Sequence, residues 1–154
     1  MSKRSSNVIA AYDPKTFHPG SSVGYLVNRV RTELLSAIDK ELAPLDVTAA
    51  QYIIMSQLAN RLADSASQLC RSISYDPGAM TRMIDRLEAK GFVRRVRCPE
   101  DRRASNLELT AEGRSVFPKL RERVVNVLNR FLRDFTQSEV RQLEGFLQRM
   151  LSSA

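Results

Sequence analysis

Apolar residues recur at intervals of three and four along most of this chain, which is the spacing of one face of an α-helix. The first such series begins after a cap at Ser21 or Ser22 and predicts a helix of about six turns that ends at Pro44. Its apolar positions are Val23, Leu26, Val27, Val30, Leu34, Ile38 and Leu42. The pattern therefore predicts a mostly helical protein.

The middle of the chain predicts two short helices joined by a tight turn. A mostly buried helix, TAAQYIIMSQLAN, comes first and is capped by Thr48. The pair follows as SASQLCRSI and, after a short break at Ser74 and Tyr75, DPGAMTRMIDRLEAKG. In the second helix Asp76 suits the N-cap, Pro77 the first helical position and Gly91 a left-handed stop. This pair is a candidate helix-turn-helix.

The apolar period changes after Gly91. The runs FVRRVRC and SNLELT are strand-like, and in the second run Leu107 and Leu109 alternate with polar residues. The charged segment Pro-Glu-Asp-Arg-Arg lies between the two runs. A β-hairpin with a charged tip, placed directly after a helix-turn-helix, predicts a winged helix-turn-helix.

Two further amphipathic helices are predicted toward the C-terminus. The first begins at Thr110, with Pro118 in its first turns, where a helix tolerates proline, and the second is capped by Thr136 or Ser138. These helices carry more apolar surface than a small winged domain can cover. Self-association through them and the first helix is therefore expected.

The predicted organisation is a single compact domain with distinct functional regions. Residues 1–19 are polar and broken by prolines, so a mobile N-terminal arm is expected there. Residues 20–46 and 110–154 are assigned to dimerisation helices. Residues 47–109 form the predicted winged helix-turn-helix, giving a mostly α fold with a small β-hairpin wing.

Composition adds a class of partner to this fold. The 154 residues include 24 Lys and Arg against 17 Asp and Glu, a net charge of +7, and the pI is near 9.9. Such a balance favours nucleic acid or an anionic surface as partner, and charge alone does not choose between them. No apolar run of about 18 residues and no signal-peptide pattern occurs, so a cytoplasmic protein without a membrane partner is expected.

Catalytic and metal-binding patterns are missing from the sequence. Its two cysteines, Cys70 and Cys98, lack C-x-x-C spacing and a nearby histidine ligand, so neither a disulfide nor a zinc site is indicated. The chain contains a single histidine, His18, and its sequence contains neither a phosphate-binding loop nor a nucleophile elbow. We therefore expect no enzyme activity, no metal and no cofactor. Cys98 is the better redox candidate, because neighbouring arginines lower a thiol pKa.

The second helix of the pair and the hairpin tip supply the candidate DNA-binding residues. A helix in the major groove reads base edges from its N-terminal half, and small residues there permit close approach. Arg82 can pair bidentately with guanine, and Thr81 can reach a base edge or a phosphate. The arginines of the tip can enter a flanking minor groove. The candidates are Ser74, Asp76, Pro77, Gly78, Ala79, Thr81, Arg82, Arg86, Asp101, Arg102 and Arg103.

Two other interpretations of these residues stay open. Arg82 and Arg86 are also what a solvated helix surface contains, and the tip is also compatible with an ordinary charged loop. A basic architectural protein that coats DNA without sequence preference is the rival function. The slim leading turn of the helix, together with Thr81 and Arg82, favours base reading.

The segment from Ser65 to Gly113 resembles the core of MarR-type (multiple antibiotic resistance regulator) transcription factors. The matching motifs are R-L-E-x-K-G, F-V-R-R, D-R-R-A and L-T-x-x-G, in this order and spacing, and the resemblance extends over residues 22 to 151. It implies a homodimer with interlocked terminal helices whose two winged domains bind double-stranded DNA at a pseudo-palindromic operator. It also implies that Arg103 enters the minor groove while Asp101 holds the wing arginines.

The same resemblance implies regulation by a small molecule. Many such proteins are repressors released by aromatic or phenolic anions bound between the dimer helices and the winged domain. The candidates for this ligand site are His18, Tyr25, Arg29, Tyr52 and Met55. Tyr52 and Met55 are also compatible with ordinary core positions, and His18 with the surface. A thiol-modulated regulator using Cys98 is the alternative, and repression and activation both stay open.

Overall fold

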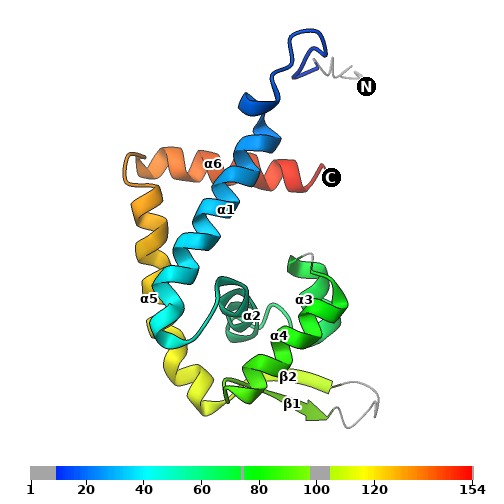
Figure 1. Ribbon diagram of the computed structural model, residues 1–154, viewed down its shortest axis with the longest axis vertical. Helices are drawn as coiled ribbons and strands as arrows, with labels where there is room; N and C mark the ends of the chain where they lie inside the picture. The colour runs from blue at the N-terminus through cyan, green and yellow to red at the C-terminus, as the bar shows by residue number, and fades with distance from the viewer. Residues whose placement is uncertain (1–9, 74, 98–104, 154) are drawn as a thin grey trace, which may run out of the picture. The chain divides into compact units, whose positions relative to one another are not determined.

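The computed structural model describes residues 10–73, 75–97 and 105–153, and of Ser105 it describes the backbone alone. Helices make up most of it, with one two-stranded antiparallel sheet (Figure 1). The elements are η1 (Pro19–Ser21), α1 (Val23–Leu42), η2 (Ala43–Leu45), α2 (Ala49–Ala59), α3 (Ala66–Ile73), α4 (Pro77–Ala89), β1 (Val93–Arg97), β2 (Ser105–Leu109), α5 (Ala111–Phe131) and α6 (Gln137–Leu151). This architecture confirms the predicted fold class.

The chain divides into two compact units, Met1–Glu33 and Leu34–Ala154. In the first unit, the Tyr12 hydroxyl accepts a hydrogen bond of 2.8 Å from the Val23 N–H at the start of α1. The Tyr12 ring also packs edge to face on Phe17, with 5.4 Å between the ring centroids. Part of the predicted arm therefore has contacts of its own, and the proposed limits of the dimerisation regions stay a prediction.

The hydrophobic core of the second unit joins the end of α1, α2, α3, α4, α5 and both strands. Its central side chains are fully buried, and each contributes about 1.5–3 kcal/mol to the stability of the fold. They are Leu42, Ile54, Met55, Leu69, Met80, Ile84, Leu87, Leu120 and Val127. The helical spacing therefore marks the core faces of α4 and α5. The apolar positions Val23, Leu26, Val27 and Val30 of α1 and the apolar face of α6 are exposed instead.

Local hydrogen bonds explain where the helices begin. Thr48 forms a capping box with Gln51 at the start of α2, and Asp76 and Thr110 cap α4 and α5 as predicted. Thr136 forms a capping box with Glu139 at the start of α6, and the hydrogen bonds that Thr136 donates lower the pKa of the Glu139 carboxyl. These caps satisfy backbone N–H groups that a helix start leaves without partners.

Pro118 is placed differently from the prediction. It lies about two turns into α5, inside the helix rather than at its start, so the expectation that it occupies the tolerant first turns is wrong. Because proline has no N–H, the helix lacks one backbone hydrogen bond at this point. The helix continues to Phe131 because its buried face, including Leu120, Val124 and Val127, is held by the core.

The two strands form the predicted hairpin directly after α4. β1 and β2 pair in an antiparallel register from Val93 opposite Leu109 to Arg97 opposite Ser105. Gly91, between α4 and β1, has φ 74°, the left-handed conformation expected of a helix stop. The hairpin is followed at once by α5, whose buried Gly113 lies against the backbone of Phe92. A Cβ at Gly113 would stand 2.0 Å from the Phe92 carbonyl oxygen, so only glycine fits there.

We predict that Gly113→Ala destabilises the fold by about 3 kcal/mol, because the added methyl group forces α5 away from β1. Chemical denaturation measures this change. Gly20→Ala is the matched control, since nothing lies within 4 Å of its added Cβ, and it is expected to change stability by less than about 0.5 kcal/mol. Equal stability of the Gly113→Ala protein and wild type would contradict the close approach.

Candidate nucleic-acid interface

α3 and α4 pack on each other as the two helices of a helix-turn-helix, and β1 follows at the end of α4 (Figure 1). One face of α4 is fully buried through Met80, Ile84 and Leu87. The opposite face is therefore left toward solvent, and this face contains Thr81, Arg82 and Arg86. α4 has the properties of a recognition helix, with a core-bound side and a basic outer side.

The first turn of α4 is slim and well ordered by its cap. The Asp76 carboxylate accepts a hydrogen bond of 2.9 Å from the Ala79 N–H. Asp76, Pro77 and Gly78 are exposed, and Ala79 is half-buried. A Cβ at Gly78 would lie 3.1 Å from the Asp76 carboxylate, which is tighter than an ordinary contact, so glycine at this position leaves the cap undisturbed. Arg82 is exposed in the second turn of the helix, within the N-terminal half from which base contacts are made.

Thr81 is more constrained than its sequence position indicates. Its hydroxyl donates a hydrogen bond of 2.9 Å to the Pro77 carbonyl within the helix. The oxygen keeps its lone pairs, so Thr81 can accept a hydrogen bond from a base amino group without losing this contact.

Four predicted DNA-binding residues, Ser74, Asp101, Arg102 and Arg103, lie outside the described residues.

The strands of the hairpin contain arginines that are paired with acids. Arg94 on β1 lies opposite Glu108 on β2, and its Nε donates a hydrogen bond of 2.6 Å to the Glu108 carboxylate. Arg95 extends to α4, where its Nη2 lies 2.7 Å from Asp85 and its Nη1 pairs with Glu88. The Arg95 N–H also donates to Glu88 at 3.0 Å. These pairs offset the positive charge that the sequence concentrates around the hairpin.

The contact from Arg95 to α4 was missed from the sequence, and it has a structural role at this interface. It ties the wing strand to the recognition helix through three polar contacts with Asp85 and Glu88. The available signal was the spacing of these acids, since residues three apart share one helix face. Their partner on another element was not predictable from that spacing.

Lys90 at the end of α4 forms a second link that sequence reasoning did not find. Its ammonium group lies 3.2 Å from the Asp46 carboxylate, donates to the Asp46 carbonyl and lies 3.3 Å from Oε1 of the buried Gln51. Asp46 ends η2 with a left-handed φ of 53°, between α1 and α2. Both ends of the recognition helix are thus held, one by its cap and core contacts and the other by Lys90.

The predicted ligand residues belong to both units. Tyr25 and Arg29 are exposed one turn apart on α1, and His18 is exposed just before η1. On α2, Met55 is fully buried, whereas the half-buried Tyr52 stacks on Phe117 with 5.9 Å between the ring centroids. Burial raises the pKa of the Tyr52 hydroxyl, which favours its neutral, hydrogen-bonding form.

Among the described ranges, no three or more His, Cys, Asp or Glu side chains gather as a metal site requires. No helix in this part of the chain is long and apolar enough to cross a membrane. Cys70 is a half-buried free thiol on α3, and Cys98 lies outside the described residues.

A helix-turn-helix whose second helix is basic on its outer face, followed directly by an antiparallel hairpin, defines a winged helix-turn-helix protein of the DNA-binding class. A family model described as MarR family matches residues 47–105. The multiple antibiotic resistance protein MarR of Escherichia coli is 32% identical over 84% of this chain and 90% of its own. The HTH-type transcriptional repressor MdtR of Bacillus subtilis is 27% identical, covering 86% and 83%.

The solved structures agree with this assignment. A crystal structure of a cysteine mutant of Escherichia coli MarR complexed with operator DNA has a TM-score of 0.76 and 31% identity, covering 83% of this chain and 92% of that one. The chain belongs to the MarR family. It is a DNA-binding transcriptional regulator and not an enzyme.

We predict that Arg95→Ala weakens DNA binding about fivefold, the effect of losing about 1 kcal/mol of positioning energy. The salt dependence of binding should not change, because Arg95 contacts Asp85 and Glu88 rather than phosphate. Fluorescence anisotropy over a salt series measures both quantities. Arg133→Ala is the matched control, since this exposed arginine pairs only with its neighbour Asp134 among the described residues.

A double-mutant cycle separates this role from general destabilisation. Glu88→Gln should weaken binding to a similar extent, and Glu88→Gln combined with Arg95→Ala should cost less than the sum of the single changes. A salt slope that falls by one unit in Arg95→Ala would instead identify Arg95 as a phosphate contact.

Proposed function

We propose that this chain is a homodimeric repressor that binds a pseudo-palindromic operator and is released by a small aromatic or phenolic anion. The observation that carries the DNA-binding part is the exposed face of α4, where Gly78, Thr81 and Arg82 lie together at the leading end of the helix. Residues of these types suit close approach and base contacts in a major groove. The repressor role is supported by the printed description of the MdtR relative as a transcriptional repressor.

Dimerisation is supported by the apolar surface of α6. This helix has no buried residue within the chain, although it is amphipathic. Phe146 is 54% exposed and Leu151 is 78% exposed, and Leu143, Leu147 and Met150 are exposed beside them. A contiguous apolar face of this kind is typical of an interface between subunits. Two copies related by a two-fold axis would place their recognition helices on half-sites about one helical turn, roughly 34–36 Å, apart.

Release by a small anion is the regulatory part of the proposal. The exposed Tyr25 and Arg29 on α1 are compatible with an aromatic anion, as are Tyr52 on α2 and His18 near η1. Met55 is fully buried and would shape the wall behind Tyr52 rather than contact the ligand directly. Release requires that the ligand binds the DNA-free dimer more tightly than the DNA-bound one. We also propose a cytoplasmic location, because the DNA of bacteria such as Escherichia coli and Bacillus subtilis, in which the relatives occur, lies in the cytoplasm.

Genome-wide recovery of the DNA bound by this chain, followed by affinity measurements at fixed salt, tests the function. We expect binding to a recovered palindrome to be at least about 10³-fold tighter than binding to random DNA of equal length. A ratio near one would contradict operator recognition and favour the architectural alternative, since phosphate contacts alone do not distinguish sequences.

The wing provides a second test, although Arg103 and Asp101 lie outside the described residues. We expect Arg103→Ala to weaken operator binding by about 1–3 kcal/mol, or to lower the salt slope by about one unit if the contact is to phosphate. Binding and slope that both match wild type would reject the proposed wing contact. For the thiol-modulated alternative, operator affinity that is equal under oxidising and reducing conditions would exclude control through Cys98.

A further inference from the structure

The three arginines of β1 differ in what holds their side chains. Arg94 is paired with Glu108 across the hairpin, and Arg95 is paired with two acids of α4. Arg97, the last residue of β1, is exposed and forms no ion pair with another described residue. Within the described part of the chain, Arg97 is therefore the arginine of this strand whose charge is not offset.

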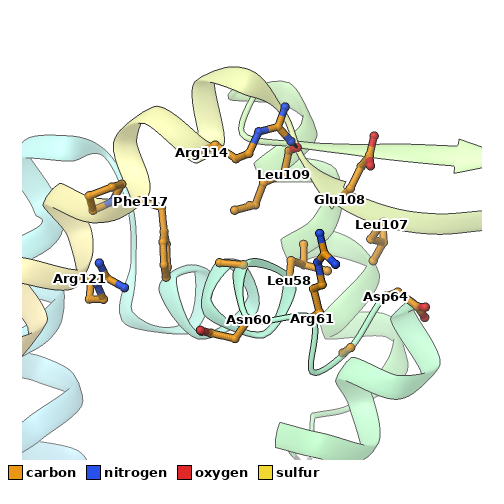
Figure 2. A pocket seen from close by; sticks show the side chains of 13 residues that line it. Leu58, Asn60, Arg61, Asp64, Leu107, Glu108, Leu109, Arg114, Phe117 and Arg121 are labelled. Atoms are coloured by element: carbon orange, nitrogen blue, oxygen red, sulfur yellow. Dashed lines mark hydrogen bonds between the residues drawn. The ribbon is translucent and has the colours of Figure 1, made fainter.

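The pleat of β1 places Arg97 on a defined face of the hairpin. Successive side chains of a strand point to opposite faces, so Val93, Arg95 and Arg97 share one face. Val93 at the start of this series is buried in the core, and Arg95 contacts α4. Figure 2, a view of the pocket beside β2, shows the same alternation on the partner strand, where Leu107 and Glu108 extend to opposite sides.

The face that contains Arg97 is the face on which α4 packs. α4 and β1 contact each other, and the Arg95 side chain joins them through Asp85 and Glu88. Arg97 is two residues, roughly 7 Å, further along the strand and past this link. DNA bound to the outer side of α4 would therefore lie on the same side of the hairpin as Arg97. Arg94 points to the opposite side, where it is paired across the hairpin.

β1 connects the two parts of the chain that are proposed to enter DNA. α4 precedes β1 and is proposed for the major groove, and residues 98–104 follow it and include the wing residues proposed for the flanking minor groove. Adjacent grooves of a duplex are separated by one sugar–phosphate backbone. A strand that joins the two parts therefore passes over this backbone, and an arginine on its DNA side is placed to bind a phosphate.

We propose that Arg97 binds a phosphate of the DNA backbone that separates the major groove entered by α4 from the flanking minor groove. This contact adds affinity without sequence preference, and it fixes the distance between β1 and the duplex. The proposal rests on the proposed function, since it requires that α4 and the wing dock on DNA in adjacent grooves.

Fluorescence anisotropy of the full-length protein over a salt series tests this contact, with the operator duplex recovered from the genome and a random duplex of equal length. Arg97→Gln should lower the slope of log affinity against log salt concentration by about one unit for each bound subunit. At about 0.1 M salt this change corresponds to roughly eightfold weaker binding per subunit, on both duplexes alike. Arg97→Lys should retain the wild-type slope, because an ammonium group also neutralises a phosphate.

Arg94→Gln is the matched control, because it removes an arginine of the same strand from the opposite face. Its salt slope should equal that of wild type, and the Tm of Arg97→Gln should also match wild type because Arg97 is exposed. A wild-type slope in Arg97→Gln, or an equal fall in Arg94→Gln, would overturn the proposal. A loss confined to the operator duplex, without rescue by Arg97→Lys, would overturn it as well, since it would identify a base contact.

The random duplex separates this proposal from the function on which it rests. Equal binding of both duplexes by wild type would contradict operator recognition, whereas a lower slope in Arg97→Gln would still support the phosphate contact. Operator preference together with an unchanged slope in Arg97→Gln would overturn the role of Arg97 and leave the proposed function standing.

Discussion

The burial of one face of α4 determines which side chains this protein can offer to DNA. Met80, Ile84 and Leu87 are fully buried, and together they contribute about 5–9 kcal/mol, comparable with the whole stability of a typical domain. Rotation of α4 about its axis would expose these side chains, so the helix cannot turn to present other residues. Thr81, Arg82 and Arg86 are therefore fixed on the outer face by a constraint that has no direct connection with DNA.

The next constraint is the pairing of charges around the hairpin. A net charge of +7 indicates affinity for a polyanion but does not say which arginines are available. Arg94 is neutralised by Glu108, and Arg95 is shared between Asp85 and Glu88. These arginines orient the strands instead of adding to the positive field. Within the described part of the candidate interface, we therefore propose the outer face of α4, rather than the paired Arg94 and Arg95 of β1, as a surface that contacts DNA.

The elements that were predictable from sequence depend on neighbouring residues. Thr48, Asp76 and Thr110 cap helices through hydrogen bonds three residues along the chain, so their role is visible locally. The pairing of Arg95 with α4 and the approach of Gly113 to Phe92 depend on where separate elements meet, which no local spacing contains. The prediction that Pro118 lies at the start of a helix was wrong, because the core, not local propensity, keeps α5 helical on both sides of this proline. The left-handed backbone conformation of Arg61, with φ 55°, could not be predicted from the sequence, since arginine is not typical of that conformation.

The links at the end of α4 indicate how regulation can act on a helix that is held so firmly. Lys90 ties the end of α4 to Asp46 and Gln51, and Arg95 ties the same helix to β1. These groups are partly exposed, so each link is worth about 1 kcal/mol or less, far below the cost of exposing the buried face of α4. The ligand proposed above would therefore be able to shift the hairpin, or the connection between α1 and α2, without unfolding the recognition helix. Because coupling energies of about 1–3 kcal/mol are enough for a 5- to 150-fold change in affinity, links of this strength are compatible with the release by a small molecule that we propose.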